Sequence, residues 1–176
     1  MAKHVLILCL MFLSAPAFSG YDKWIRPPAI EFNLSEETLT CLARSNYLDI
    51  YEISGRINPV YLRADLNGDG KMEDVVFIRR VRDKKDGLLI CYKSGKSQIL
   101  FAGNHVKHIG GPEKSSDDLS RVDSWFVYTG SLGTGFEDAP PPPRAKGEVL
   151  SIGRMETWSR ALYWTGKEFV TYQLGD

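Results

Sequence analysis

The sequence predicts an α+β fold, in which one short N-terminal helix packs on a mostly antiparallel, meandering β-sheet within a single domain. Apolar residues recur at helical spacing in one segment, residues 36–46. From residue 47 onward, short β-rich segments follow one another, separated by Gly, Asn and Pro. Because these separations are short, successive strands are expected to pair antiparallel.

Residues 1–19 have the layout of a secretory signal peptide. Lys3 gives a basic start, and residues 5–13 form an apolar run that is too short for a stable membrane anchor. Small residues follow, and cleavage after Ala17 or after Ser19 fits the pattern about equally. The expected location is therefore the periplasm or the medium, and a retained anchor is the alternative.

The charge balance limits the classes of partner. Removal of residues 1–19 takes away Lys3 and no acid, so the 22 basic side chains become 21 against 22 acidic ones, a formal charge of −1. Such a balance creates no long-range field for nucleic acid. Residues 20–176 contain no second stretch apolar enough to cross a membrane, and their length suits one domain.

Two cysteines, Cys41 and Cys91, remain after the leader is removed. In an oxidising compartment such a pair predicts one disulfide. The bond would close a long loop, and loop-closure entropy then gives at most ~4 kcal/mol of stabilisation. Two buried thiols are the alternative. The cysteines lack the Cys-x-x-Cys spacing of zinc or thioredoxin-like sites.

The helix is expected over residues 36–46 because Ser35 has the character of an N-cap and two glutamates occupy the first turn, where the helix dipole favours acids. Segment 75–78 is continuously apolar, which predicts a central strand covered on both faces. Residues 165–167 are expected to form a hairpin turn with Gly. The expected strands are 47–53, 60–62, 75–78, 87–92, 98–102, 125–129, 161–164 and 169–172.

Two stretches are expected to be loops. Residues 105–121 are rich in Gly, Ser and Asp, and residues 130–147 contain four consecutive prolines at 140–143. Such a proline run favours an extended polyproline II rod. We interpret the rod as a stiff surface loop, and a docking ligand is the alternative.

Residues 65–74 are the segment with the clearest candidate metal ligands. Oxygen-bearing side chains occupy loop positions 1, 3 and 5, as Asp65, Asn67 and Asp69. Gly70 at position 6 permits the sharp turn of a loop that curls around an ion. Calcium takes six to eight oxygen ligands, so this spacing predicts a calcium site.

The remaining ligands define the kind of site. The carbonyl of Lys71 would supply a backbone oxygen, and Glu73 or Asp74 would close the shell. An EF-hand requires a bidentate Glu at position 12, where this chain has Val76 in an apolar run, so an EF-hand is excluded. A strand–loop–strand calcium site remains, with manganese or magnesium as the alternative ion.

A metal-free hairpin turn at Asn67-Gly68 is the competing interpretation, because this dipeptide favours turns by itself. A turn does not require four carboxylates within ten residues, and these would repel one another with Lys71 alone to offset them. The four are Asp65, Asp69, Glu73 and Asp74.

Residues 61–76 resemble the calcium loops of FG-GAP and VCBS repeats, the type found in integrin alpha propellers. Those loops have the pattern Asp-x-Asp/Asn-x-Asp-Gly-x-x-Asp before an apolar strand. The family's closing Asp falls on Glu73, and Asp74 stands one residue later. The resemblance implies a calcium loop, but a propeller needs several such blades, so its fold and adhesion function are not implied. Four residues match position for position, namely Asp65, Asn67, Asp69 and Gly70.

A second resemblance covers most of the chain after the leader. Residues 56–59, 163–167 and 172–176 have the sequences Arg-Ile-Asn-Pro, Tyr-Trp-Thr-Gly-Lys and Tyr-Gln-Leu-Gly-Asp. These stretches are similar to those of a set of small exported bacterial proteins. The resemblance implies an exported single domain and implies no mechanism.

Other candidate sites have simpler interpretations. His105 and His108 stand three apart, which on a helix would suit zinc, but the surrounding glycines predict a loop. The basic run 79–85 includes Asp83, which favours a solvated hairpin tip over a site for an acidic partner. The aromatic residues near the C-terminus are expected in the core, although alternating ones could line a sugar- or peptide-binding face. We therefore expect no catalytic residues.

The sequence thus predicts a non-enzymatic, calcium-stabilised binding module that presents a surface to a protein partner. An inhibitor or immunity-type role against a toxin or hydrolase is one version. An exported metal-assisted hydrolase is the first alternative, and it requires an open coordination position and a general base. A structural domain with a metal-free turn is the second.

Overall fold

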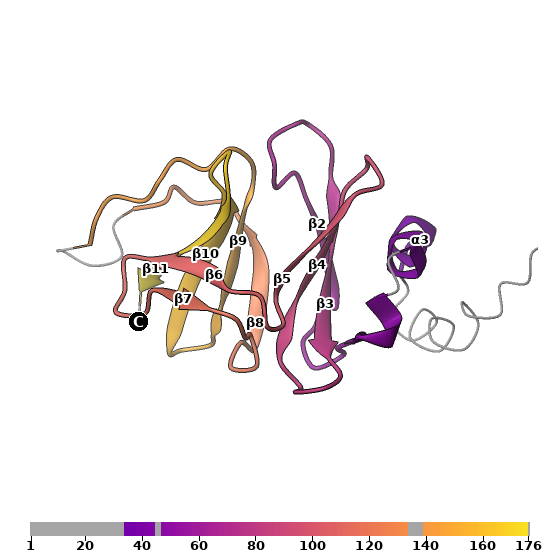
Figure 1. Cartoon of the computed structure of the whole chain (residues 1–176). Helices are drawn as coiled ribbons and strands as arrows, with labels where there is room; N and C mark the ends of the chain where they lie inside the picture. Colours follow the sequence, from indigo (N-terminus) through magenta and orange to yellow (C-terminus); the bar gives the residue numbers. More distant parts are fainter. Residues whose placement is uncertain (1–33, 45–46, 134–138, 176) are drawn as a thin grey trace, which may run out of the picture.

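One helix and two β-sheets lie in successive layers (Figure 1). The computed structural model describes residues 34–44, 47–133 and 139–175, so the expected signal peptide lies outside the described residues. Helix α3 (Glu36–Arg44) and the 3₁₀ turn η1 (Tyr47–Asp49) pack on the outer side of the first sheet. Within the described ranges, no helix has the length and apolar character needed to span a membrane.

The first sheet consists of five antiparallel strands from a continuous part of the chain. Strand β3 pairs with both β1 and β2 on one side and with β4 on the other, and β5 follows β4. The five strands are β1 (Tyr51–Ile53), β2 (Tyr61–Ala64), β3 (Glu73–Arg80), β4 (Asp86–Cys91) and β5 (Ser97–Phe101).

The second sheet has six strands in the order β7-β6-β11-β10-β9-β8. Strands β8 to β11 form an antiparallel meander, whereas β11 runs parallel to β6. The C-terminal strand therefore lies inside the sheet. The six strands are β6 (Val106–Ile109), β7 (Ser115–Ser116), β8 (Ser124–Tyr128), β9 (Val149–Arg154), β10 (Trp158–Trp164) and β11 (Phe169–Gly175).

Strand β3 confirms the expected central strand with two covered faces. Successive side chains of a strand point to opposite sides. Val75 and Phe77 are buried in the apolar core between the two sheets, and Val76 and Ile78 are buried in the core beneath α3. A third apolar cluster, which includes Tyr163, lies on the outer face of the second sheet, against Ala145 of the proline-rich segment.

The expected fold class is confirmed only in part. The chain is mostly antiparallel β-structure with one short helix, but it is a mostly-β fold rather than an α+β fold. The single meandering sheet is wrong, because the strands divide into two sheets and include the parallel pair β6–β11. The apolar run in β3 indicated that both of its faces are covered, but it did not indicate that a second sheet covers one of them.

Most expected elements are present with shifted ends. The described helix is Glu36–Arg44, and residues 45–46 of the expected helix lie outside the described residues. Residues 47–49 form a 3₁₀ turn where a strand was expected. Segment 105–121 was expected to be a loop, yet it contains β6 and β7, and β9 was not expected. In the proline-rich segment, the described residues 130–133 and 139–147 contain no helix or strand, as expected.

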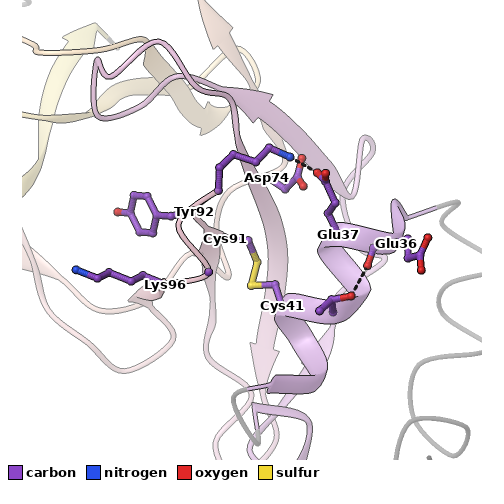
Figure 2. Close-up of a pocket in the computed structure, with 10 residues that line it drawn as sticks. Glu36, Glu37, Cys41, Asp74, Cys91, Tyr92 and Lys96 are labelled. Atoms are coloured by element: carbon purple, nitrogen blue, oxygen red, sulfur yellow. Dashed lines mark hydrogen bonds and ion pairs between the residues drawn. A yellow bond between two sulfur atoms is a disulfide. The ribbon is translucent and has the colours of Figure 1, made fainter.

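The disulfide between Cys41 and Cys91 is confirmed (Figure 2). It joins α3 to the end of β4, and its Cα–Cα distance of 6.0 Å lies in the usual range for such bonds. An ion pair between Lys93 and Glu37 links the same two parts of the fold, and it lowers the pKa of the Glu37 carboxyl. The helix is therefore held to the sheet by a covalent bond and a surface ion pair.

An ion pair with a buried carboxylate connects the first sheet to the segment that precedes β8. The Asp86 carboxylate has no exposed surface, and it accepts hydrogen bonds from Arg56 Nε at 2.9 Å and from Arg79 Nε at 2.6 Å. The Arg56 guanidinium also donates to the carbonyls of Val122 and Leu119, at 2.6 and 3.0 Å. We call this group the arginine clamp.

Candidate metal centre

The loop that joins β2 to β3 is longer than a simple hairpin turn. The paired residues Ala64 and Glu73 close the two strands, and residues 65–72 curl between them. Leu66 is 1% exposed and belongs to the core between the sheets, so it anchors the loop. Gly70 has a φ of +82°, in the region that glycine adopts readily, which agrees with its expected role in the turn.

Side-chain oxygens hold the curl of the loop by accepting backbone N–H groups. Asp65 Oδ1 accepts from Gly68 at 2.8 Å and from Asp69 at 3.1 Å, and its Oδ2 accepts from Gly70 at 2.8 Å. Asn67 Oδ1 accepts from Asp69 N–H at 2.8 Å. Since these bonds join residues two to five apart, the spacing of the acids is sufficient to shape the loop.

Asp69 and Lys71 complete this local pattern. Asp69 Oδ1 accepts the Lys71 N–H at 2.9 Å, and both side chains are exposed. A carboxylate oxygen has two lone pairs, so an oxygen that accepts one N–H can still bind a cation. That the Lys71 carbonyl is a ligand remains a prediction.

Glu73 lies beneath the loop as a buried carboxylate. It is 1% exposed, and it accepts hydrogen bonds from Leu66 N–H at 2.8 Å and from Asn67 Nδ2 at 3.1 Å. Burial raises the pKa of the Glu73 carboxyl, and the charges of Asp69 and Asp65 raise it further, although the hydrogen bonds oppose the shift. The ionised form of Glu73 is therefore less favourable in the folded protein than it is in water.

Three carboxylates of the loop converge. Asp65, Asp69 and Glu73 each offer one oxygen, and these oxygens lie within 4.8 Å of one another. Two oxygens bound to one calcium ion at about 2.3–2.6 Å are at most about 5 Å apart, so the spacing fits one shared ion. Among the described residues, no Lys, Arg or His forms an ion pair with any of the three.

Asp74 lies apart from this group. It follows Glu73 in β3, so its side chain points to the opposite face, toward the pocket beside the disulfide (Figure 2). It is 2% exposed, and its Oδ1 lies 3.0 Å from Arg63 Nε as an ion pair, although the angle is not that of a hydrogen bond. Of the two candidates for the closing ligand, the geometry brings Glu73 to Asp65 and Asp69.

Glu148 is a neighbour of the loop that sequence reasoning missed. Asp65 N–H donates to Glu148 Oε2 at 2.7 Å, and Glu148 N–H donates to the Asp65 carbonyl at 2.7 Å. Glu148 lies immediately before β9, so it belongs to the segment that leads into the second sheet. Because Glu148 lies 83 residues from Asp65 in the chain, no local sequence pattern indicated this contact.

The backbone of segment 146–148 lies directly against the loop. A Cβ atom on Gly68, whose φ is +76°, would lie 2.0 Å from the Lys146 carbonyl oxygen. Lys146 N–H in turn donates to the Trp164 carbonyl of β10. The loop therefore packs so closely against segment 146–148 that no side chain fits at position 68. This segment is in turn hydrogen-bonded to the second sheet.

The two histidines of interest do not reach this loop or converge with each other. His105 Nδ1 pairs with Ser115 Oγ at 3.1 Å, and His108 Nδ1 pairs with Thr171 Oγ1 at 2.9 Å. Burial lowers the pKa of His108 to about 4, and the charge of Arg160 acts in the same direction. In the described part of the chain, the group Asp65, Asp69 and Glu73 is the one cluster of three potential metal-binding side chains.

The basic run at the β3–β4 turn is covered by local acids. Arg80 pairs with Asp83 at 2.6 Å, and Lys85 pairs with Asp117. The Arg80 hydrogen bond lowers the pKa of Asp83 to about 2. These pairs neutralise part of the basic run, although Arg80 is 8% exposed and therefore packs into the fold rather than into solvent.

Comparisons of the chain with known protein families, with characterised proteins and with solved structures find no match.

Proposed function

We propose that the chain is an exported, non-enzymatic binding module whose fold is stabilised by a calcium ion in loop 65–74. The supporting observation is the convergence of Asp65, Asp69 and Glu73, with Glu73 buried and no cationic side chain paired to them in the described ranges. A cation with oxygen affinity would offset both the repulsion and the burial cost.

The proposed ligands are the side chains of Asp65, Asn67, Asp69 and Glu73, with the Lys71 carbonyl. Bound calcium would fix the β2–β3 connection in the form that contacts Glu148 and segment 146–148. Metal binding would therefore stabilise the contact between the two sheets as well as the loop. Export is supported by the disulfide, because such bonds persist in oxidising compartments.

The binding role is proposed to concern a protein partner, and an inhibitor or immunity-type role is one form of it. The alternative of a metal-assisted hydrolase needs a general base beside an open coordination position. Neither candidate histidine, His105 or His108, belongs to the cluster of Asp65, Asp69 and Glu73, which favours the binding module.

The test is thermal unfolding of chelator-treated protein, residues 20–176, as calcium is added, with magnesium as the competing ion. Extracellular modules bind calcium with Kd of about 10⁻⁴ to 10⁻³ M, so 10 mM calcium is a ten- to hundred-fold excess. Mass action then adds about 1.4–2.7 kcal/mol. The Tm is expected to rise by roughly 3–10 °C.

The double variant Asp65→Asn/Asp69→Asn is expected to lose this rise. The matched control, Asp49→Asn/Glu156→Gln, removes two exposed acids outside the loop and is expected to keep it. A Tm that calcium leaves unchanged in the wild-type protein would establish the metal-free turn. An equal response to magnesium would assign the site to another divalent ion.

A further inference from the structure

The outer face of the second sheet carries a hollow of about 690 Å³, a size within the range of ligand pockets of about 300–1,000 Å³. Side chains alternate along strands, so Trp125 faces the core while its neighbours in β8 face the hollow. Six residues from β8, β9 and β10 form its floor and one wall, namely Ser124, Phe126, Tyr128, Ser151, Gly153 and Ser159.

Phe126 is an exposed aromatic ring at the wall of this hollow. Its side chain is 52% exposed, and its register partner in β9 is Ser151. Met155, which is 68% exposed, lines the same hollow at the β9–β10 turn. A covered aromatic ring buries about 150–250 Å², so leaving Phe126 in water forgoes a substantial stabilisation. Clustered exposed apolar side chains of this kind mark binding surfaces.

The floor of the hollow offers hydroxyl groups that the protein itself does not use. Ser151 is 4% exposed, and neither Ser151 nor Ser159 makes a side-chain hydrogen bond to the described residues. Each hydroxyl can donate one hydrogen bond and accept two. The hydroxyl of Ser151 keeps contact with solvent at the hollow, so it is available to a ligand as it is to water.

The charged residues that line the hollow limit the net charge of a ligand that it could bind. Its charged lining residues are one cation and one anion, Arg154 and Glu156, which flank the same turn. This balance favours a neutral molecule. The main-chain groups of β9 and β10 in the floor are paired with strands on both sides, whereas β8 is the edge strand of the sheet. A peptide that adds to a sheet would pair with the open edge of β8 rather than lie over the paired main chain of β9 and β10.

We propose that this hollow binds a neutral carbohydrate. A hexopyranose has an apolar C–H face and a rim of hydroxyl groups. The C–H face would stack on the Phe126 ring, and the hydroxyl groups would bond to Ser151 and Ser159. Because the hollow lies on the outer face of the second sheet, this binding is independent of the calcium proposal.

The first measurement is binding of the labelled protein, residues 20–176, to an array of neutral and acidic oligosaccharides in calcium-containing buffer. The bound neutral oligosaccharide is then titrated into ¹⁵N-labelled protein. Shifts are expected at amides of residues 124–128 and 149–159, with saturation in the micromolar to millimolar range. Retention of acidic oligosaccharides alone, or of no oligosaccharide, would overturn the proposal.

Variants test the stated contacts. Phe126→Leu is expected to weaken binding at least tenfold, while Phe126→Tyr keeps the ring and the affinity. Ser151→Ala is expected to weaken it several-fold. Ile50→Ala removes another exposed apolar side chain, 49% exposed beside η1, and is expected to change nothing. Equal Tm values would show that the variants fold, and unchanged affinity in Phe126→Leu would refute the assignment.

Discussion

Two of the polar contacts between the first sheet and the part of the chain that carries the second sheet have opposite designs. In the arginine clamp, the Asp86 carboxylate lies between two guanidinium groups, which belong to Arg56 and Arg79. In the calcium loop, Asp65, Asp69 and Glu73 converge without a cationic side chain among the described residues. Both contacts bury a carboxylate, but only the clamp contains its own positive charge.

This difference shows which of the two contacts depends on the ions and the pH of the solution. A buried carboxylate with two arginine partners is satisfied whatever ions are present, so the clamp should hold in every condition that keeps the protein folded. The loop keeps its shape through backbone hydrogen bonds, yet its charges remain uncompensated. Its strength should therefore follow the concentration of calcium and the pH, and the predictions below separate the two contacts.

The largest effect is expected from Asp86→Ala, which leaves two guanidinium groups without their shared acid. The free energy of unfolding should fall by about 3 kcal/mol or more, by the same amount with and without calcium. Urea denaturation in chelator and in 10 mM calcium measures both values. Glu52→Ala, whose ion pair with Lys84 is exposed at both ends, is the control and should cost no more than about 1 kcal/mol. A calcium-dependent loss in Asp86→Ala would remove the distinction between the two contacts.

A second prediction compares two glycines of the loop. Gly68→Ala adds a strained positive φ and a clash with the Lys146 carbonyl, so it should cost about 2–4 kcal/mol. Gly70→Ala has the same kind of φ but open space around it, and should cost about 1 kcal/mol. Chemical denaturation in calcium measures both. Equal losses would mean that segment 146–148 does not press on the loop in solution.

The third prediction concerns pH. The pKa of Glu73 is raised by burial, so the folded protein holds this proton more tightly than the unfolded chain does. Without calcium, this residue's contribution to stability should increase as the pH falls through the raised pKa toward the ordinary glutamate pKa of 4.5. Over the same range, protons should compete with calcium and weaken its binding by up to about tenfold per pH unit.

The control for this prediction is Glu73→Gln, which cannot titrate. The difference in stability between wild type and Glu73→Gln isolates Glu73 from groups that act the other way. His108 is one such group, because its pKa of about 4 means that stability falls as the unfolded chain takes up a proton below pH 6.5. Parallel pH profiles of the two proteins in chelator would contradict the account of Glu73.

The smallest effect is expected from Glu148→Gln, which keeps an oxygen for the Asp65 N–H but removes one charge. Because Glu148 is exposed and hydrogen-bonded to the loop, the free energy of unfolding should change by less than about 1 kcal/mol. Calcium affinity should decrease slightly, since a nearby negative charge is lost, and isothermal titration measures it. A complete loss of calcium binding would make Glu148 a direct ligand.

The curl of the loop could be predicted from the sequence because its hydrogen bonds are local. Asp65, Asn67 and Asp69 bond to N–H groups two to five residues ahead, so their spacing alone specifies the turn. The disulfide followed from the number of cysteines and the expected compartment. Which of Glu73 and Asp74 faces the loop needed the strand's orientation, and this depends on the two cores.

The division into two sheets could not be predicted, because short connections do not show where one sheet ends. Strands β6 and β7 were missed because they are short and lie in a segment rich in Gly, Ser and Asp. The parallel pairing of β6 with β11 joins residues more than sixty apart in the chain. Glu148 was missed for the same reason, since its role depends on the packing of one sheet against the other.

The position of β11 between β6 and β10 has a consequence for vectorial synthesis. Every strand of the first sheet is made by residue 101, whereas the second sheet lacks an interior strand until residue 169 and beyond emerge. A nascent chain arrested before residue 169 is therefore expected to protect β1–β5 from protease while β6–β10 remain cleavable. Loss of the last seven strand residues would divide the second sheet in two rather than fray its edge.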